Sequence, residues 1–143
     1  MKRIWILTLI ILPELLWACS CNIGEVPEKF NDHVSIFQGV VTEVIYYDST
    51  DMSGDQHIKV TFDIEKQWKG QRNQNQLLTV NNGMSCFGYW YKKGQTYIVY
   101  AFEEGDHLNN WWCGGVIPES ERPEGFKSEA KALDALVAKQ IEE

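Results

Sequence analysis

The sequence has few basic residues and none of the short motifs that mark the common classes of enzyme. It contains no nucleophile elbow, phosphate-binding loop, zinc-protease helix motif or dinucleotide fingerprint. Its 13 Lys and Arg are outnumbered by 20 Asp and Glu, and they form no cluster. A nucleic-acid-binding surface needs clustered cations to replace the counterions that phosphates condense. We therefore expect no enzyme, no cofactor, no metal site of its own and no nucleic-acid partner.

The chain also lacks a long hydrophobic run, an internal repeat and a low-complexity tract. Its apolar run covers only residues 4–12, whereas a membrane-spanning helix needs about 20 apolar residues. Lys2 and Arg3 precede this run, and the small residue Ala18 follows it. These parts are typical of an export signal, so we expect residues 1–18 to be removed by cleavage between Ala18 and Cys19. The mature protein would then be secreted or periplasmic.

The expected mature chain, residues 19–143, is acidic and of a size that suits one domain. Loss of the leader leaves 11 of the 13 basic and 19 of the 20 acidic residues, a net charge of −8. A chain of this length can build a single hydrophobic core but not two. We expect one domain and a monomer.

Only four cysteines occur, and all lie at or beyond the expected cleavage site: Cys19, Cys21, Cys86 and Cys113. Disulfides persist in the oxidising compartments to which an export signal leads. Four cysteines allow three pairings. A bridge between Cys19 and Cys21 would close a strained ring, so two long-range bridges are expected, and a catalytic cysteine is not.

Hydrophobic patterning predicts five strands followed by one helix. The strands are expected at residues 34–47, with a bend or bulge at Gly39, and at 57–68, 76–80, 94–102 and, more weakly, 112–117. Residues 47–56 are expected to form an exposed hairpin loop. The helix, at about 126–142, places on one stripe the apolar residues Ala130, Leu133, Leu136, Val137 and Ile141. Five strands without βαβ alternation favour a mainly β fold, a small barrel with a C-terminal helix.

The remaining candidate residues for binding are histidines and aromatic residues. His33, His57 and His107 are scattered beside polar residues, and we interpret them as surface histidines without a ligand role. The segments FGYWY (87–91) and WW (111–112) allow either a stacking platform for sugars or single-stranded nucleic acid, or core and hairpin packing. The sequence leaves the role of Trp90, Trp111 and Trp112 open.

Cleavage before Cys19 would place a chemically distinctive group at the start of the mature chain. An α-amine has a pKa near 8, so part of it is neutral at physiological pH and able to coordinate a metal. The amine and the carbonyl oxygen of Cys19 together can form a five-membered chelate on a zinc ion with an open coordination position. Such a position is typical of the catalytic zinc of a metalloproteinase. Ser20 would then project into the pocket that normally takes the substrate residue after the scissile bond.

Several segments of the chain together resemble the netrin-like module of the tissue inhibitors of metalloproteinases. They are C-S-C after the leader, VSIFQGVV, VTFDIEKQWKG, GMSCFG and WWCGG, which cover about residues 19–117. The resemblance implies a five-stranded oligonucleotide/oligosaccharide-binding (OB) barrel and inhibition of zinc metalloendopeptidases. It also implies chelation of the target's zinc by Cys19, a specificity-pocket contact by Ser20 and flanking contacts by Met84 and Ser85. The bridges that it implies are Cys19–Cys86 and Cys21–Cys113.

The leader allows a second interpretation. Leu16-Trp17-Ala18-Cys19 also resembles a bacterial lipobox, in which Cys19 would carry a lipid. Lipidation would remove both the bridge and the chelate at this residue, and it would leave three cysteines, an odd number, in an oxidising space. The alternative function is therefore a binding or structural module of the cell envelope, built on the same barrel and anchored to the membrane only through Cys19.

Overall fold

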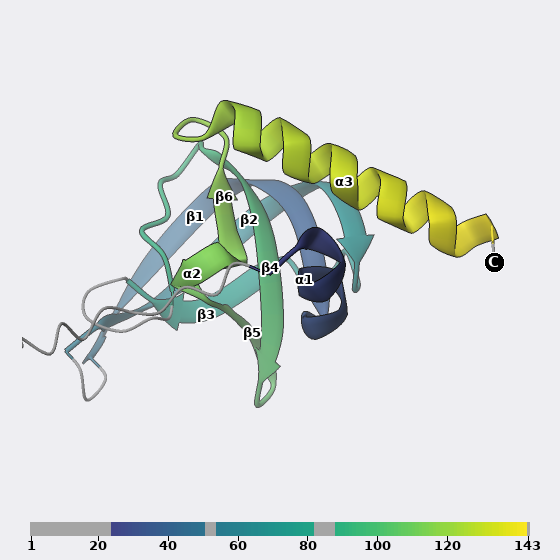
Figure 1. The fold of residues 1–143 in the computed structure, drawn as a ribbon. Coiled ribbons are helices and arrows are strands. Elements are labelled where there is room, and N and C mark those ends of the chain that lie inside the picture. The colour runs from purple at the N-terminus through teal and green to yellow at the C-terminus, as the bar shows by residue number, and fades with distance from the viewer. Residues whose placement is uncertain (1–23, 51–53, 82–87, 143) are drawn as a thin grey trace, which may run out of the picture.

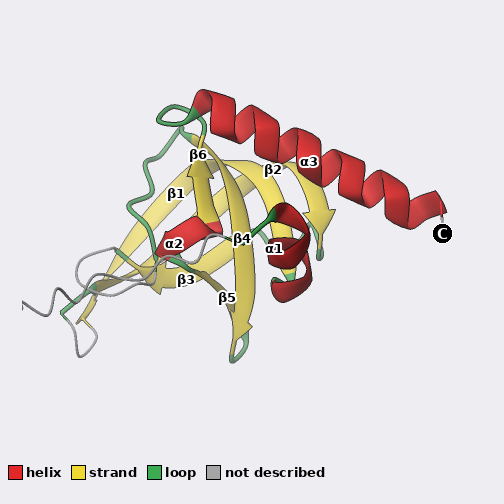
Figure 2. Cartoon of the chain, viewed as in Figure 1, coloured by secondary structure: helices red, strands yellow, loops and turns green. Residues whose placement is uncertain are grey.

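The computed structural model describes residues 24–50, 54–81 and 88–142. In chain order its elements are the helix α1 (Val26–Asp32), the strands β1 (Ser35–Thr50), β2 (Gln56–Lys69), β3 (Gln76–Val80), β4 (Thr96–Glu104) and β5 (His107–Asn110), the short helix α2 (Trp112–Gly115), the strand β6 (Val116–Pro118) and the helix α3 (Pro123–Glu142). Figure 1 shows the strands curving around a common interior and α3 lying across them. Figure 2 shows strands making up most of the body and helices lying at its surface.

The sheet closes into a barrel of five strands. Its strand order is β1-β2-β3-β5-β4, and β4 pairs again with β1. All of these pairings are antiparallel except β3 with β5, which are parallel and share the single pair Leu77 and Leu108. The predicted mainly β barrel with a C-terminal helix is therefore confirmed.

The long first strand bends where the sequence predicts it. The β1–β2 register shifts between Gln38 and Gly39, as expected for a bulge that lets one strand serve two neighbours. A side chain at Gly39 would come within 2.9 Å of the carbonyl oxygen of Asp63 on β2. Glycine thus allows the close approach at the bend, and β1 can pair with both β2 and β4.

The prediction of a strand over residues 112–117 was wrong for most of this range. Residues 112–115 form α2, only 116–118 form β6, and the fifth barrel strand is instead the short β5 at 107–110. β5 was missed because its sequence, HLNN, has only one apolar residue, and tertiary pairing with β4 decides its conformation. The hairpin loop expected at 47–56 is also shorter, because the ladder continues to the pair Thr50 and Gln56.

Two hydrophobic clusters hold the fold together, one inside the barrel and one between its outer face and the helices. β4 contributes to both, since Tyr97, Val99 and Ala101 face the interior whereas Ile98 and Tyr100 face the helices. The outer cluster contains Phe30, Ile36, Ile98, Tyr100, Trp68, Ile117, Phe126 and Leu133. This double burial explains why β4 is a nearly continuous apolar run in the sequence.

The amphipathic stripe of α3 is confirmed except at its end. Leu133 is fully buried, and Ala130, Leu136 and Val137 pack against the outer cluster. Ile141 is 80% exposed, because the last turns of α3 extend beyond the barrel (Figure 1). The helix also begins earlier than the patterning predicts, at Pro123, a residue suited to a first helical turn.

Candidate functional site

Most of the residues predicted to act lie outside the described residues. These are Cys19, Ser20, Cys21, Met84, Ser85 and Cys86, together with the expected cleavage site after Ala18. Cys113 is described, on α2, and it is disulfide-bonded. The pairings Cys19–Cys86 and Cys21–Cys113 stay predictions. The structure does describe the elements that flank these cysteines.

Gly88 and Asn110 join the two segments that lead to Cys86 and Cys113. The amide N–H of Gly88 donates to the carbonyl oxygen of Asn110 at 2.9 Å, and the side-chain Nδ2 of Asn110 donates back to the Gly88 carbonyl at 3.2 Å. Asn110 is fully buried, and its own N–H donates to Oδ1 of Asn109 at 2.8 Å. Since buried hydrogen bonds hold backbone segments firmly in place, residues 88 and 110 form a rigid junction at this end of the barrel.

The helix α1, which follows the N-terminal segment, is fastened to the barrel by lysine side chains. Lys69 on β2 donates from Nζ to the carbonyl oxygens of Phe30 and Asn31, at 2.6 and 3.3 Å. These carbonyls lie in the last turn of the helix, where a cation also interacts favourably with the helix dipole. Sequence analysis missed α1, although Pro27 in its first turn and the apolar pair Val26 and Phe30, four residues apart, are consistent with a short helix.

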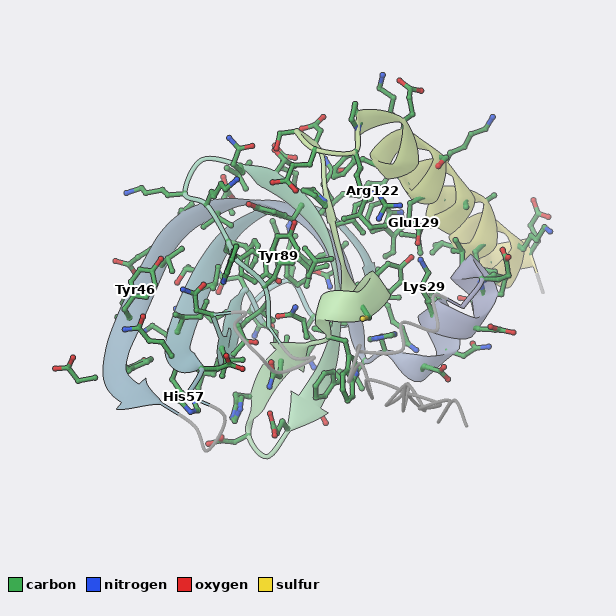
Figure 3. All side chains as sticks on the ribbon, turned by 60° about the vertical axis from the view of Figure 1, so that its left-hand side comes forward. Lys29, Tyr46, His57, Tyr89, Arg122 and Glu129 are labelled. Atoms are coloured by element: carbon green, nitrogen blue, oxygen red, sulfur yellow. The ribbon has the colours of Figure 1, made fainter. Side chains whose placement is uncertain are left out.

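Lys29 connects α1 to α3 through a nearly buried ion pair with Glu129. Their side chains are only 10% and 14% exposed, and they approach each other between the two helices (Figure 3). Tyr100 on β4 also donates its hydroxyl to Glu129 at 2.6 Å, and the Lys29 ammonium lies 4.7 Å from the centre of the Tyr100 ring. Burial, then the hydrogen bond to Glu129, raise the pKa of Tyr100. The position of α1 therefore depends on one polar cluster assembled from three elements.

His33 was expected at the surface, but it is half-buried beside this cluster. One ring nitrogen donates to the carbonyl oxygen of Lys29 at 2.7 Å, and the ring packs edge-on against Tyr100 at 5.4 Å. Burial lowers the pKa of His33, although the hydrogen bond to Lys29 and the charge of Asp32 act in the opposite direction. The surface interpretation was wrong because the ring of Tyr100, distant in the sequence, covers one side of His33.

The lowered pKa of His33 predicts a loss of stability in mild acid. The unfolded chain takes up a proton near the ordinary histidine pKa of about 6.5, before the folded protein does. The contribution of His33 is thus fully present above this pH and is lost as the pH falls through the folded-state pKa. We expect His33→Gln to reduce the fall in the free energy of unfolding between pH 7.5 and 5.5, measured by urea denaturation. The control is the same substitution at the exposed His57. If the free energy of unfolding had the same pH dependence in His33→Gln and in the wild type, the prediction would be contradicted.

The aromatic segments do not form a single platform among the described residues. Tyr91 is buried in the barrel interior, where it packs edge-on against Phe62 and Tyr97. Trp90 is 62% exposed, and Trp111, 40% exposed, lies against Phe102 with ring centres 5.2 Å apart. Core packing therefore accounts for Tyr91. The side chain of Trp112 lies outside the description.

In residues 24–50, 54–81 and 88–142, no three His, Cys, Asp or Glu side chains are grouped so that they could hold a metal ion. No helix in this part of the chain has the length and apolar character needed to cross a membrane. No protein-family model matches the chain, and no curated protein matches it.

Proposed function

We propose that the mature protein inhibits zinc metalloendopeptidases in the manner of the tissue inhibitors of metalloproteinases, through the free α-amine and carbonyl of Cys19. In this mechanism both groups bind the catalytic zinc of the target and occupy the position where substrate and water would bind. Ser20 enters the adjoining pocket, and Met84 and Ser85 contact the cleft beside it. The inhibitor needs no metal of its own, because the target supplies the zinc.

The observation that carries this proposal is the junction between Gly88 and Asn110. Gly88 lies two residues after Cys86, and Asn110 lies three residues before Cys113. Two cysteines separated by a single residue, Cys19 and Cys21, can both form bridges only if their two partners are near each other on the barrel. The two hydrogen bonds of the junction support this arrangement, and the disulfide-bonded state of Cys113 is consistent with it.

The contacts that hold α1 against the barrel would also favour binding to a protease. Bridges at Cys19 and Cys21, together with the contacts of Lys29 and Lys69, would restrain the N-terminal segment on both sides. A restrained segment loses little conformational entropy when it enters the cleft of a protease, and preorganisation of this kind improves affinity.

A comparison of two chains that differ by one residue tests the chelate. One chain begins at Cys19 and the other retains Ala18, so that the amine of Cys19 becomes an amide nitrogen that does not coordinate zinc. We expect only the first to inhibit hydrolysis of a fluorogenic peptide by a secreted zinc metalloendopeptidase. Equal urea-denaturation curves would show that both chains fold. Equal inhibition by both chains, or no inhibition by either, would rule the mechanism out.

A second candidate, a lipid-anchored envelope module, is favoured by the sequence Leu16-Trp17-Ala18-Cys19. A lipid on Cys19 would occupy its sulfur and leave no bridge there. The intact mass and non-reducing peptide map of the native protein separate the two candidates. An unmodified Cys19 bridged to another cysteine supports the inhibitor, whereas a lipid adduct at Cys19 supports the anchored module.

A further inference from the structure

The loop between β3 and β4 presents one large aromatic side chain to the solvent. Trp90 is 62% exposed, whereas its neighbours Tyr89 and Tyr91 are half-buried and buried. Tryptophan is enriched among the residues that contribute most to protein–protein binding, because its ring buries a large apolar area. We call residues 88–95, the part of this segment that carries Trp90, the Trp90 loop.

The residues beside Trp90 hold the Trp90 loop in one conformation. The ring of Tyr91 lies in the barrel interior, with its centre 5.5 Å from that of Phe62 and 5.1 Å from that of Tyr97. The backbone N–H of Lys92 donates to the hydroxyl of Tyr97 at 3.0 Å. Trp90 is therefore presented on an anchored backbone. A side chain held in this way loses little conformational entropy on binding, which favours affinity.

The Trp90 loop lies close to the cysteines that the proposed inhibition uses. Trp90 follows Cys86 by four residues, so their Cα atoms are at most about 14 Å apart. A disulfide joins Cα atoms about 6 Å apart, which places Trp90 within about 20 Å of Cys19 if these two cysteines are bridged. An ordinary protein–protein interface covers about 800 Å² on each partner, a patch of roughly 16 Å radius. Since the indole extends outward from its Cα, it reaches the border of a contact surface centred on Cys19.

Two lysines give the Trp90 loop a positive charge in an acidic protein. Lys92 and Lys93 are exposed, and residues 88–95 contain no Asp or Glu. Glu121 pairs with Lys92 at 3.3 Å, although the Lys92 side chain stays 67% exposed, and it offsets only part of this charge. Complementary charges across an interface increase the association rate and select among partners. The loop thus complements an apolar surface bordered by acidic residues.

A protein matches this loop better than an anionic membrane does. Each lysine near such a membrane contributes only about 1 kcal/mol of attraction. The expected mature chain has a net charge of −8, so an extended anionic surface repels the molecule as a whole. A protein partner can instead place a few acidic residues against the Trp90 loop alone.

We propose that Trp90 packs against the target protease beside its active-site cleft, on an apolar surface bordered by acidic residues that Lys93 contacts. This inference rests on the proposed inhibition and adds a determinant of which proteases are inhibited. The chelate at Cys19 can form on any catalytic zinc with an open coordination position. Selectivity among such proteases therefore depends on contacts away from the zinc, and the Trp90 loop supplies one of them.

Inhibition constants of two variants test the role of Trp90. All chains begin at Cys19, and the assay uses a fluorogenic peptide with a panel of secreted zinc metalloendopeptidases that includes thermolysin. Against the proteases that the wild type inhibits, Trp90→Ala should weaken inhibition by about tenfold. Trp90→Phe, which keeps an aromatic ring, should recover part of this loss. The control Ile141→Ala removes a side chain that is 80% exposed on α3, and it should inhibit as the wild type does. Equal urea-denaturation curves would show that the loss comes from the contact and not from unfolding.

Lys93→Glu tests the charge of the partner surface. It should slow association with the inhibited proteases, and the difference from the wild type should shrink at high salt, because salt screens exposed charges. An unchanged association rate, or a reduction that salt does not affect, would contradict an acidic partner surface.

The assay distinguishes failure of this inference from failure of the proposed function. If the wild type inhibits no protease of the panel, both are overturned. If the wild type inhibits and Trp90→Ala inhibits equally, only the contact of Trp90 is overturned. Retention of the wild type but not of Trp90→Ala on phosphatidylglycerol vesicles, with equal inhibition by both chains, would assign the loop to a membrane surface and refute the protease contact.

Discussion

Replacement of Lys29 by methionine should destabilise the protein by about 3 kcal/mol, because it leaves the carboxylate of Glu129 nearly buried without its cation. Methionine has a similar length and fills most of the same space, so lost packing contributes little to this value. The hydroxyl of Tyr100 remains the other hydrogen-bond donor to Glu129. The free energy of unfolding in urea measures the effect.

The exposed pair Lys127 and Glu124 on α3 is the matched control. Its side chains are 71% and 88% exposed, and its charged atoms are 3.4 Å apart. Exposed pairs contribute 0 to about 1 kcal/mol, so Lys127→Met should change stability by less than about 0.5 kcal/mol. If Lys29→Met had an effect as small as this control, the ion pair between α1 and α3 would not be a structural link.

A second substitution tests whether the unpaired charge of Glu129 accounts for the effect of Lys29→Met. Glu129→Gln keeps an acceptor for Tyr100 but removes the negative charge. In the Lys29→Met background it should restore about half of the lost stability, because no unpaired charge then remains buried. Introduced alone, it should destabilise the protein, since it leaves the Lys29 ammonium without its partner. An effect of Glu129→Gln on stability that is favourable in Lys29→Met and unfavourable in the wild type would show that the two side chains interact as a buried ion pair.

Gly88→Ala should cost about 2 to 5 kcal/mol and disturb the junction that carries the proposed function. Gly88 has a φ of +73°, a conformation that costs an alanine about 1–2 kcal/mol. The added Cβ would also lie 1.8 Å from the carbonyl oxygen of Val80, so the main chain of β3 must move. Displacement in a packed region adds about 1–3 kcal/mol. Urea denaturation measures the sum.

Gly94 allows the two contributions to be separated. Its φ is +80°, but beyond its two chain neighbours no atom of the described residues lies within 4 Å of the position of an added Cβ. Gly94→Ala should therefore show the conformational cost alone, about 1–2 kcal/mol. If both alanine variants lost the same stability, the contact between Gly88 and β3 would be looser than the structure indicates. Loss of inhibition in Gly88→Ala but not in Gly94→Ala would further connect the junction to the proposed mechanism.

The patterning of the sequence by itself determined the class of fold and most of its strands. Alternating apolar residues, as in HIKVTFDI, predict a strand with one buried face wherever it lies in the barrel. The bulge at Gly39 and the apolar stripe of α3 were also predictable, since both depend on residues close together in the chain. The N-terminal chemistry proposed for Cys19 rests on the sequence alone, because Cys19 lies outside the described residues.

Tertiary structure decided what depends on residues far apart in the chain. β5 is a strand because β4 pairs with it, and His33 is half-buried because Tyr100 lies against it. Lys29 and Glu129 are 100 positions apart, and neither has a local pattern that predicts its partner. Two adjoining hollows that share Tyr47, Leu78 and His107 likewise combine residues from five strands, β1 to β5, and the turns between them. Local periodicity reports which face of an element is buried, but only closure of the barrel determines which elements meet there.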